Sequence, residues 1–186
     1  MKNVLTVISG PSGVGKGTIV KEILKRRSDV VASVSCTTRA PREGEVHGRE
    51  YFFVSEEEFE RRVKENGFLE YNKHFKGSYG TPRDFVEESL KEKSVILEIE
   101  VNGALNAKKA APDALLIMIA PPSVEELRRR LIGRGTETEE EVETRLARVQ
   151  YELSKADEYD YVVVNDDLER AIEEVNALID KAKKQK

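Results

Sequence analysis

The chain has 186 residues, and its 31 Lys and Arg nearly balance 35 Asp and Glu, which leaves a formal net charge of −4. This length suits one domain with a substantial core. The charge balance argues against a general nucleic-acid-binding protein, which would carry a strong basic excess. The single cysteine, Cys36, excludes an intramolecular disulfide, and neither a targeting pattern nor a membrane-length apolar run is present. We therefore expect a cytoplasmic protein with no nucleic-acid or membrane partner.

The first strong motif follows a predicted strand over residues 4–9. It reads Gly10-Pro11-Ser12-Gly13-Val14-Gly15-Lys16-Gly17-Thr18 and matches the pattern of a phosphate-binding loop. Glycines let backbone N–H groups turn inward around an anion, and a helix opening near Lys16 adds unpaired donors and the positive end of its dipole. Lys16 would add a full charge near the outer phosphates of a nucleotide. The alternative is a plain glycine-rich turn between a strand and a helix.

The rest of the first half alternates between helical and strand patterns. We predict, in chain order, a helix to about residue 27, a buried strand at 30–36, a loop at 37–48, a strand at 51–54, a helix capped by Ser55 with Glu58, a strand at 68–75, a turn at 76–80 and a helix from Thr81 and Pro82.

The second half continues the alternation. We predict a strand at 95–101, a helix at 103–110, a strand at 115–119, helices capped by Ser123 and Thr138, a strand at 161–164 and a closing helix over 168–183. Apolar strands separated by helices imply a parallel sheet covered on both faces. We therefore predict an α/β fold of the P-loop NTPase type in a single domain. Its core comprises residues 1–38, 91–122 and 158–186, with an α+β insert at 39–90 (the insert) and a helical excursion at 123–157 (the lid).

The insert gathers side chains that suit a phosphate. Arg39 and Arg42 are forked, permanently charged donors, and Tyr51 and Tyr79 could each add a hydroxyl. The alternative is a pair of surface arginines in a solvated loop, and Glu45 is most often a solvated charge in such a loop.

Two carboxylates interrupt the apolar strand predicted at 95–101. Glu98 and Glu100 are two residues apart, so we expect them on the same side of the sheet, near its carboxyl edge where ligands bind in open α/β sheets. A carboxylate in a parallel strand is costly unless it is paired or linked to a metal. Contact with a nucleotide's base, sugar or hydrated Mg²⁺ would explain them, and so would a strand end that reaches solvent.

The lid is rich in arginine. Arg145 falls at the edge of an apolar helical stripe and can lean inward, where it could stabilise the charge of a transferring phosphoryl group. Arg148 sits further round the helix, near Glu141 and Glu152, where an ordinary surface ion pair explains it better. The run 128–130 is expected to be a solvated helix face.

Together these stretches resemble the guanylate kinase family over about residues 3–183. The matching stretches are GPSGVGKGT (10–18), SCTTRAPREGE (35–45), GREYFF (48–53), FLEY (68–71), YGTP (79–82), LEIEVNGA (97–104), RGTET (134–138) and VVVNDD (162–167). The resemblance implies an NMP-binding insert, a helical lid and an ATP:GMP phosphotransferase that uses Mg²⁺ and converts ATP and GMP (and dGMP) to ADP and GDP.

The resemblance also implies a role for each matching residue. The loop from Gly10 to Thr18 would hold the ATP phosphates, with Asn165 near the adenine. The GMP phosphate would be held by Ser35, Arg39, Arg42, Tyr51 and Tyr79, and guanine would be read by Glu70 and Thr81. Glu45, Glu98 and Glu100 complete the expected GMP site, and Lys16, Arg42, Arg134 and Arg145 are the expected catalytic cations.

The chain departs from its relatives at two places that bear on this implication. Many relatives carry Asp at positions 98 and 100, and many have Ser after the loop lysine, where Gly17 stands. Gly17 cannot ligate a metal, so we expect Mg²⁺ to be held mainly by phosphates and water, with Thr18 as the candidate protein ligand. Two other readings remain: a non-catalytic module of the same family that binds phosphorylated partners, and a P-loop kinase for another phosphorylated acceptor.

Overall fold

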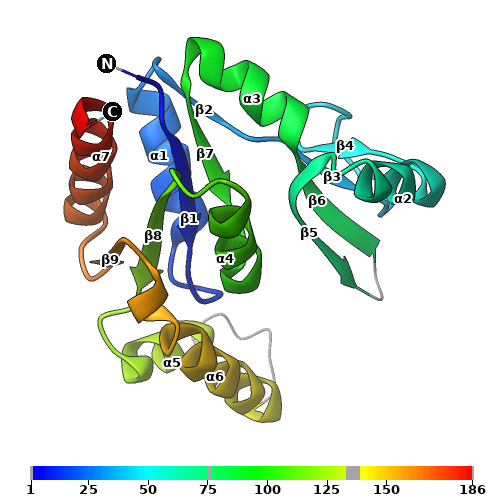
Figure 1. The fold of residues 1–186 in the computed structure, drawn as a ribbon. Helices are drawn as coiled ribbons and strands as arrows, with labels where there is room; N and C mark the ends of the chain where they lie inside the picture. Colours follow the sequence, from blue (N-terminus) through cyan, green and yellow to red (C-terminus); the bar gives the residue numbers. More distant parts are fainter. Residues whose placement is uncertain (1, 75–76, 133–138, 186) are drawn as a thin grey trace.

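A computed structural model describes residues 2–74, 77–132 and 139–185. Its centre is a parallel sheet of five described strands, drawn in Figure 1. Every neighbouring pair in this sheet is parallel, which confirms the predicted sheet type. Their order across the sheet is β2 (Val30–Ala32), β7 (Ser94–Glu98), β1 (Leu5–Ser9), β8 (Leu115–Ala120) and β9 (Tyr161–Val164).

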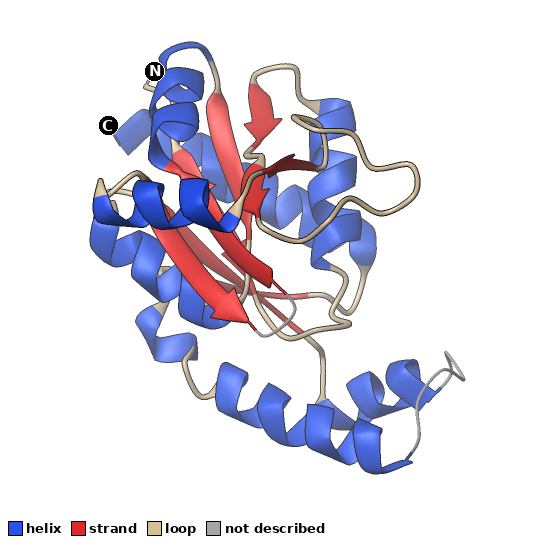
Figure 2. Ribbon diagram, turned by 90° about the vertical axis from the view of Figure 1, so that its right-hand side faces the viewer, coloured by secondary structure: helices blue, strands red, loops and turns tan. Residues whose placement is uncertain are grey.

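Helices cover both faces of this sheet, as Figure 2 shows. Successive residues of a strand point to opposite faces, and both faces of β1 are buried. Ile8 packs in a cluster with residues of α1 (Lys16–Arg26) and α7 (Leu168–Gln185). Val7 packs in a second cluster with residues of α3 (Arg83–Glu92) and α4 (Val101–Ala110). The doubly covered α/β fold predicted from the sequence is confirmed.

A second, smaller sheet projects from this core. Its strand order is β4 (Tyr51–Phe53), β3 (Ser35–Thr37), β6 (Gly77–Pro82) and β5 (Phe68–His74), and α2 (Glu56–Lys64) packs against it (Figure 1). The Ser55 hydroxyl accepts a hydrogen bond from the Glu58 amide, so the predicted helix cap is confirmed. The buried cluster of this unit is small, since Cys36, Phe59 and Phe68 form its centre.

Two of the predicted elements around the insert are wrong. The single strand expected at 30–36 is two strands: β2 pairs with β7 in the main sheet, and β3 pairs with β4 and β6 in the small sheet. The chain changes sheets just after the Ser33 amide donates its last bond to the Ile96 carbonyl (2.8 Å). The turn expected at 76–80 is also wrong, because Gly77 already begins β6. The small sheet therefore takes a strand from before residue 39.

The strand expected at 95–101 ends early. β7 stops at Glu98, and Glu100 is the N-cap of α4, whose first turn begins at Val101. The apolar residues after Glu100 have helical spacing, because Val101, Ala104 and Ala107 are all buried on one face of α4. The expectation that Glu98 and Glu100 lie on one side of a strand is therefore wrong.

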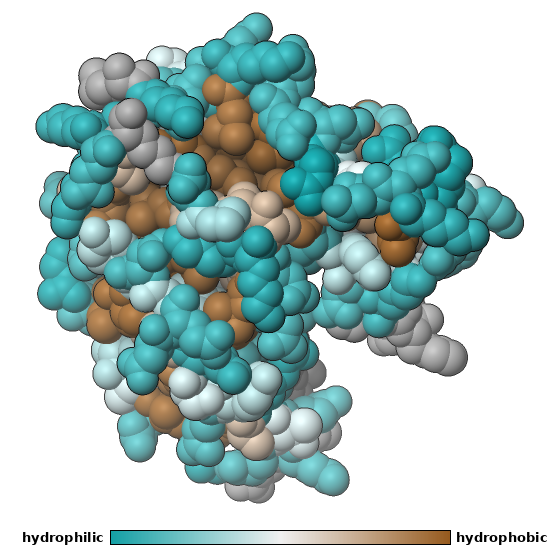
Figure 3. Space-filling view, viewed as in Figure 1, coloured by the Kyte–Doolittle hydropathy of each residue, from teal (hydrophilic) through white to brown (hydrophobic). Residues whose placement is uncertain are grey.

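The lid consists of α5 (Val124–Ile132) and α6 (Glu139–Leu153), which pack against each other, and η1 (Ala156–Glu158). The Ser123 hydroxyl accepts from the Glu126 amide, as predicted, whereas the cap expected at Thr138 lies outside the described residues. The apolar residues Leu127, Leu146 and Val149 join the same cluster as α1. In the part of the chain that the structure describes, no helix is long and apolar enough to cross a membrane. The face seen in Figure 3 is largely hydrophilic over the second sheet.

Candidate active site

The phosphate-binding loop joins β1 to α1 and takes its shape from its glycines. Gly10 has φ +141°, and a side chain there would place its Cβ 2.1 Å from the Ile119 carbonyl oxygen in β8. Gly15 has φ +97° and precedes the first helical residue, Lys16. Both positions therefore require glycine, the first because of close packing and both because of their backbone conformation. The predicted arrangement of strand, loop and helix is confirmed.

Lys16 folds back over this loop. Its Nζ donates to the carbonyl oxygens of Gly10 (2.6 Å) and Pro11 (2.9 Å). Burial lowers the pKa of Lys16, while the carboxylates of Glu98 and Glu152 oppose that effect. Binding of an anionic ligand beside this ammonium group would therefore be strongly favourable.

A cavity of about 250 Å³ opens beside the loop; it is called the loop cavity below. Of the predicted loop residues, Pro11 and Val14 are buried and Gly17 and Thr18 are exposed on the first turn of α1. Gly13 has φ +85°. The residues that line the cavity are Gly10, Ser12, Lys16, Glu100, Arg145, Arg148, Val149 and Glu152.

Asn165 lies just after β9 and supports the loop from behind. Its Nδ2 donates to the Val14 carbonyl (2.7 Å), and the side chain is buried. A Cβ at Gly15 would stand 2.6 Å from the same Nδ2. Asn165 therefore holds the loop in shape, and its predicted contact with adenine stays a prediction.

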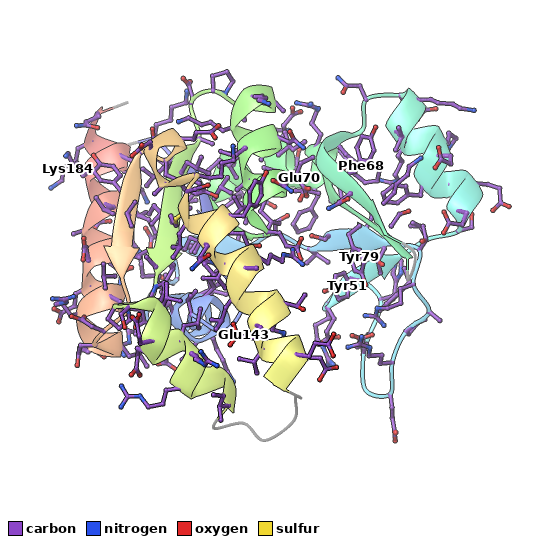
Figure 4. The ribbon with its side chains drawn as sticks, turned by 90° about the horizontal axis from the view of Figure 1, so that it is seen from below. Tyr51, Phe68, Glu70, Tyr79, Glu143 and Lys184 are labelled. Atoms are coloured by element: carbon purple, nitrogen blue, oxygen red, sulfur yellow. The ribbon has the colours of Figure 1, made fainter. Side chains whose placement is uncertain are left out.

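A larger cavity of about 670 Å³, called the acceptor cavity below, lies between the small sheet and the core. Figure 4 shows Tyr51 and Tyr79 together on the small sheet, with Glu70 on the same unit. Their ring centroids are 5.9 Å apart. The structure brings six of the predicted GMP-site residues to this one cavity: Ser35, Tyr51, Glu70, Tyr79, Glu98 and Glu100.

Glu70 is the most buried acid of this cavity, with 9% of its surface exposed. Burial raises the pKa of its carboxyl group, and hydrogen bonds from Thr81 oppose the rise. The Thr81 hydroxyl donates to Oε1 at 2.6 Å across the β5–β6 pair. Thr81 itself is fully buried and does not line the cavity, so the structure places it behind Glu70, and its predicted contact with guanine stays a prediction.

The loop arginines of the insert are placed differently from each other. Arg39 is 14% exposed, donates from Nη2 to Glu45 (2.9 Å) and stacks over the Tyr51 ring at 5.4 Å. Its Nε is buried and has no hydrogen-bond partner among the described residues. Arg42 is exposed and is not among the residues that line the acceptor cavity, although its amide donates to Glu45. Glu45 therefore organises this loop rather than being a free solvated charge.

Gly17 and Glu98, two of the positions at which the sequence departs from the family resemblance, lie next to each other. A Cβ at Gly17 would stand 3.4 Å from Glu98 Oε1, so the longer carboxylate at position 98 occupies the space beside the missing side chain at position 17. Burial raises the pKa of Glu98, and Lys16 opposes the rise. A Glu98 carboxylate oxygen thus stands beside the first turn of α1.

Comparisons with known proteins agree with this geometry. A family model described as guanylate kinase matches residues 2–182. The chain belongs to the guanylate kinase family. Guanylate kinase of Caldanaerobacter subterraneus subsp. tengcongensis is 50% identical over 96% of this chain and 87% of its own length. That of Clostridium tetani is 51% identical over 96% and 86%. The crystal structure of guanylate kinase from Anaplasma phagocytophilum matches with a TM-score of 0.75 and 35% identity, over all of this chain and 88% of that chain.

The positions of the lid arginines were only partly predicted from the sequence. Arg145 lines the loop cavity, whereas Arg134 lies outside the described residues. Arg148 does pair with Glu152, as predicted, but it also pairs with Glu100 and lines both cavities. The predicted ion pair with Glu152 is confirmed, but the prediction was incomplete, because helix geometry alone could not show that Glu100 stands opposite α6.

Three other residues of the acceptor cavity were missed, namely Asn72, Ile99 and Gly103. Asn72 lies two positions after Glu70 on β5, so it is on the same face, and strand alternation could have found it. Gly103 lies in the first turn of α4, where an added Cβ would stand 2.9 Å from Glu70 Oε2. The glycine leaves room for the Glu70 carboxylate, and no sequence pattern indicates that role.

Proposed function

We propose that this family member transfers the γ-phosphoryl group of ATP to GMP, and also to dGMP, giving ADP and the guanosine diphosphate. The observation that carries the proposal is a buried carboxylate, Glu70, facing an acceptor cavity that adjoins the phosphate-binding loop. Lys16 and the loop bind the ATP phosphates. Ser35, Arg39, Tyr51 and Tyr79 bind the GMP phosphate, with Arg42 joining them from its exposed loop.

Guanine recognition follows from the chemistry of Glu70. A carboxylate accepts hydrogen bonds from guanine N1–H and from the exocyclic N2 amino group, and adenine offers the opposite pattern at those positions. A buried polar group that loses its partner costs much of the binding energy, so the wrong base is rejected strongly. Thr81 fixes the orientation of the Glu70 carboxylate through its 2.6 Å hydrogen bond.

The transfer itself needs no protein nucleophile, because the acceptor is already a phosphate anion. The residues align the two nucleotides in line and neutralise the charge that spreads over the transferring oxygens. Lys16 and Arg145 stand at the loop cavity, and the Arg39 guanidinium group stacks over Tyr51, which lines the acceptor cavity. Closure of the insert and the lid over both nucleotides would exclude water and prevent ATP hydrolysis.

The residues present also fit Mg²⁺. The described residues hold no cluster of three or more His, Cys, Asp or Glu that could bind a metal by itself. The Thr18 hydroxyl and the Glu98 carboxylate at the start of α1 are hard oxygen donors of the kind that Mg²⁺ prefers, directly or through water. When bound, Mg²⁺ would neutralise charge on the ATP phosphates, and those phosphates would supply most of its ligands.

A coupled ADP-release assay with GMP, dGMP, AMP, UMP and CMP tests the proposal. We expect turnover with GMP and dGMP and a preference over AMP of at least about 10³-fold. Equal turnover with AMP would overturn guanine specificity. Tight GMP binding without ADP release would support the non-catalytic module instead, and calorimetric titration of GMP measures it in parallel.

A further inference from the structure

The loop cavity and the acceptor cavity share two of the described residues that line them, Glu100 and Arg148. Glu100 occupies the N-cap position of α4 in the core, and Arg148 belongs to α6 in the lid. The donor phosphates would lie in one cavity and the acceptor nucleotide in the other, so the boundary between the cavities is where the transferring group must pass. Arg148 is the cation at that boundary.

Its guanidinium group is held from two sides. Nε donates to Glu152 Oε1 at 3.0 Å, one helical turn along α6. Nη2 donates to Glu100 Oε2 at 2.9 Å across the boundary. The two carboxylates differ in environment, because the Glu152 side chain is 9% exposed whereas that of Glu100 is 56% exposed.

This difference gives the two ion pairs different roles. The pair with Glu152 lies within one helix and its carboxylate is buried, although the Arg148 side chain is 60% exposed, so it is the more persistent of the two pairs and orients the guanidinium plane. The pair with Glu100 is exposed and joins two separate elements, so it is weak and easily exchanged for another anion. A phosphoryl group with three charged oxygens is the stronger partner in a site from which water is excluded.

We propose that Arg148 is a third lid cation of the phosphoryl transfer: its Nη2 exchanges Glu100 for an oxygen of the transferring phosphoryl group, while Glu152 keeps Nε in place. Arg148 is thus a catalytic residue and Glu152 is its positioning residue. The inference rests on the proposed phosphotransfer, and it extends that proposal to a residue outside the set that the family resemblance identifies.

The test is the kinetics of Arg148→Ala and Arg148→Lys with ATP and GMP. We expect Arg148→Ala to lower kcat about 30- to 100-fold with little change in KM for either nucleotide, since the contact forms mainly in the transition state. Lysine keeps the charge but cannot hold two anions in a fixed plane, so Arg148→Lys should recover only part of kcat. Addition of guanidinium ion at about 20 mM should restore part of the kcat of Arg148→Ala and should not speed Arg148→Lys.

The matched control is Arg129→Ala, which removes the same charge from the other lid helix at an exposed position paired with Glu126. It should leave kcat within about twofold. A bisubstrate nucleotide, in which adenosine and guanosine are joined by five phosphates, should lose affinity for Arg148→Ala far more than GMP alone does. Thermal unfolding of each variant shows whether the lid helices remain packed.

A Glu152→Gln variant tests the positioning role. It keeps an oxygen acceptor for Nε but removes the charge, so we expect a fall in kcat smaller than that of Arg148→Ala and no further fall when both changes are combined. If Arg148→Ala turns over GMP like the unchanged protein, the inference is overturned while the proposed function stands. If the unchanged protein shows no ADP release with GMP, the proposed function itself fails.

Discussion

The phosphate-binding loop holds its shape through contiguous backbone, whereas the acceptor cavity depends on side chains that come from β3, β4, β5, β6 and the start of α4. In the loop, nine successive residues carry most of the geometry, supported by the Asn165 side chain, and a single added methyl group at Gly10 would collide with β8. Glu70 and Tyr51 come from different strands, and they line one cavity because the small sheet holds β4 and β5 in place. The donor side is therefore local and the acceptor side is assembled.

The largest effect on turnover should come from removing Lys16, the positively charged side chain of the loop. We expect Lys16→Ala to lower kcat/KM about 10³-fold or more, because the ammonium would neutralise the transferring phosphates in a dry site. Burial already lowers the pKa of Lys16, so its charge costs free energy in the folded protein and its loss should not lower the melting temperature. The ADP-release assay and a thermal melt measure the two quantities.

Lys21→Ala is the matched control, since Lys21 is exposed on the same helix. It should match the unchanged protein in both measurements. Near-normal turnover by Lys16→Ala would show that the loop works through its backbone alone.

The sequence predicted the strand–loop–helix arrangement of the donor side for this reason. A strand, a glycine-rich loop and a helix are neighbours in the chain, so spacing alone places Lys16. It did not predict where strand 30–36 divides, because Val30 and Cys36 both look like buried strand residues and the change of sheet is a tertiary event. The second partner of Arg148 was missed for the same reason, since Glu100 is 48 residues away.

The second-largest effect on turnover should come from the acceptor cavity. We expect Glu70→Gln to lower kcat/KM for GMP about 10²-fold, because the amide cannot accept from both guanine donors, while the loop still binds ATP normally. Exposed Glu87 on α3 provides the control substitution Glu87→Gln, which should leave turnover unchanged. Equal losses for ATP and GMP binding would show that the two sides are not separate.

The same variant has a pH signature. Burial raises the pKa of Glu70 above its unfolded value, so the ionised carboxylate destabilises the folded protein when the pH exceeds that folded pKa. Stability from this group rises as the pH falls through the folded pKa. Glu70→Gln should therefore be at least as stable as the unchanged protein at pH 7. The difference in stability should shrink in acid, where Glu70 of the unchanged protein becomes protonated and therefore neutral. A stability loss at pH 7 that persists in acid would contradict the burial argument.

A smaller effect should follow when only the orientation of Glu70 is loosened. Thr81→Val keeps the shape of a fully buried side chain but removes the 2.6 Å hydrogen bond. We expect KM for GMP to rise about tenfold and the free energy of unfolding to fall by about 1 kcal/mol. Thr81→Ser retains the donor and should keep most of the GMP affinity, which separates loss of the hydroxyl from loss of packing. Unchanged KM for Thr81→Val would assign the orientation of Glu70 to β5 alone.

The smallest effect concerns how easily the small sheet opens compared with the core. Cys36 is fully buried in the small cluster with Phe59 and Phe68, and burial raises the pKa of its thiol to about 11. A thiol reagent at pH 8 should therefore react only when the small sheet opens, and this cluster is much smaller than the core around β1 and α1. We expect labelling to occur well before global unfolding in a urea series.

GMP at about three times its Kd should slow that labelling about fourfold, because ligand binding competes with opening of the sheet. ATP alone should leave the rate unchanged, since the loop lies on the core and not on the small sheet. Equal protection by ATP would mean that the two sides open together. The donor site would then still be built from a local stretch of chain and the acceptor site from several elements, but the two would not open independently.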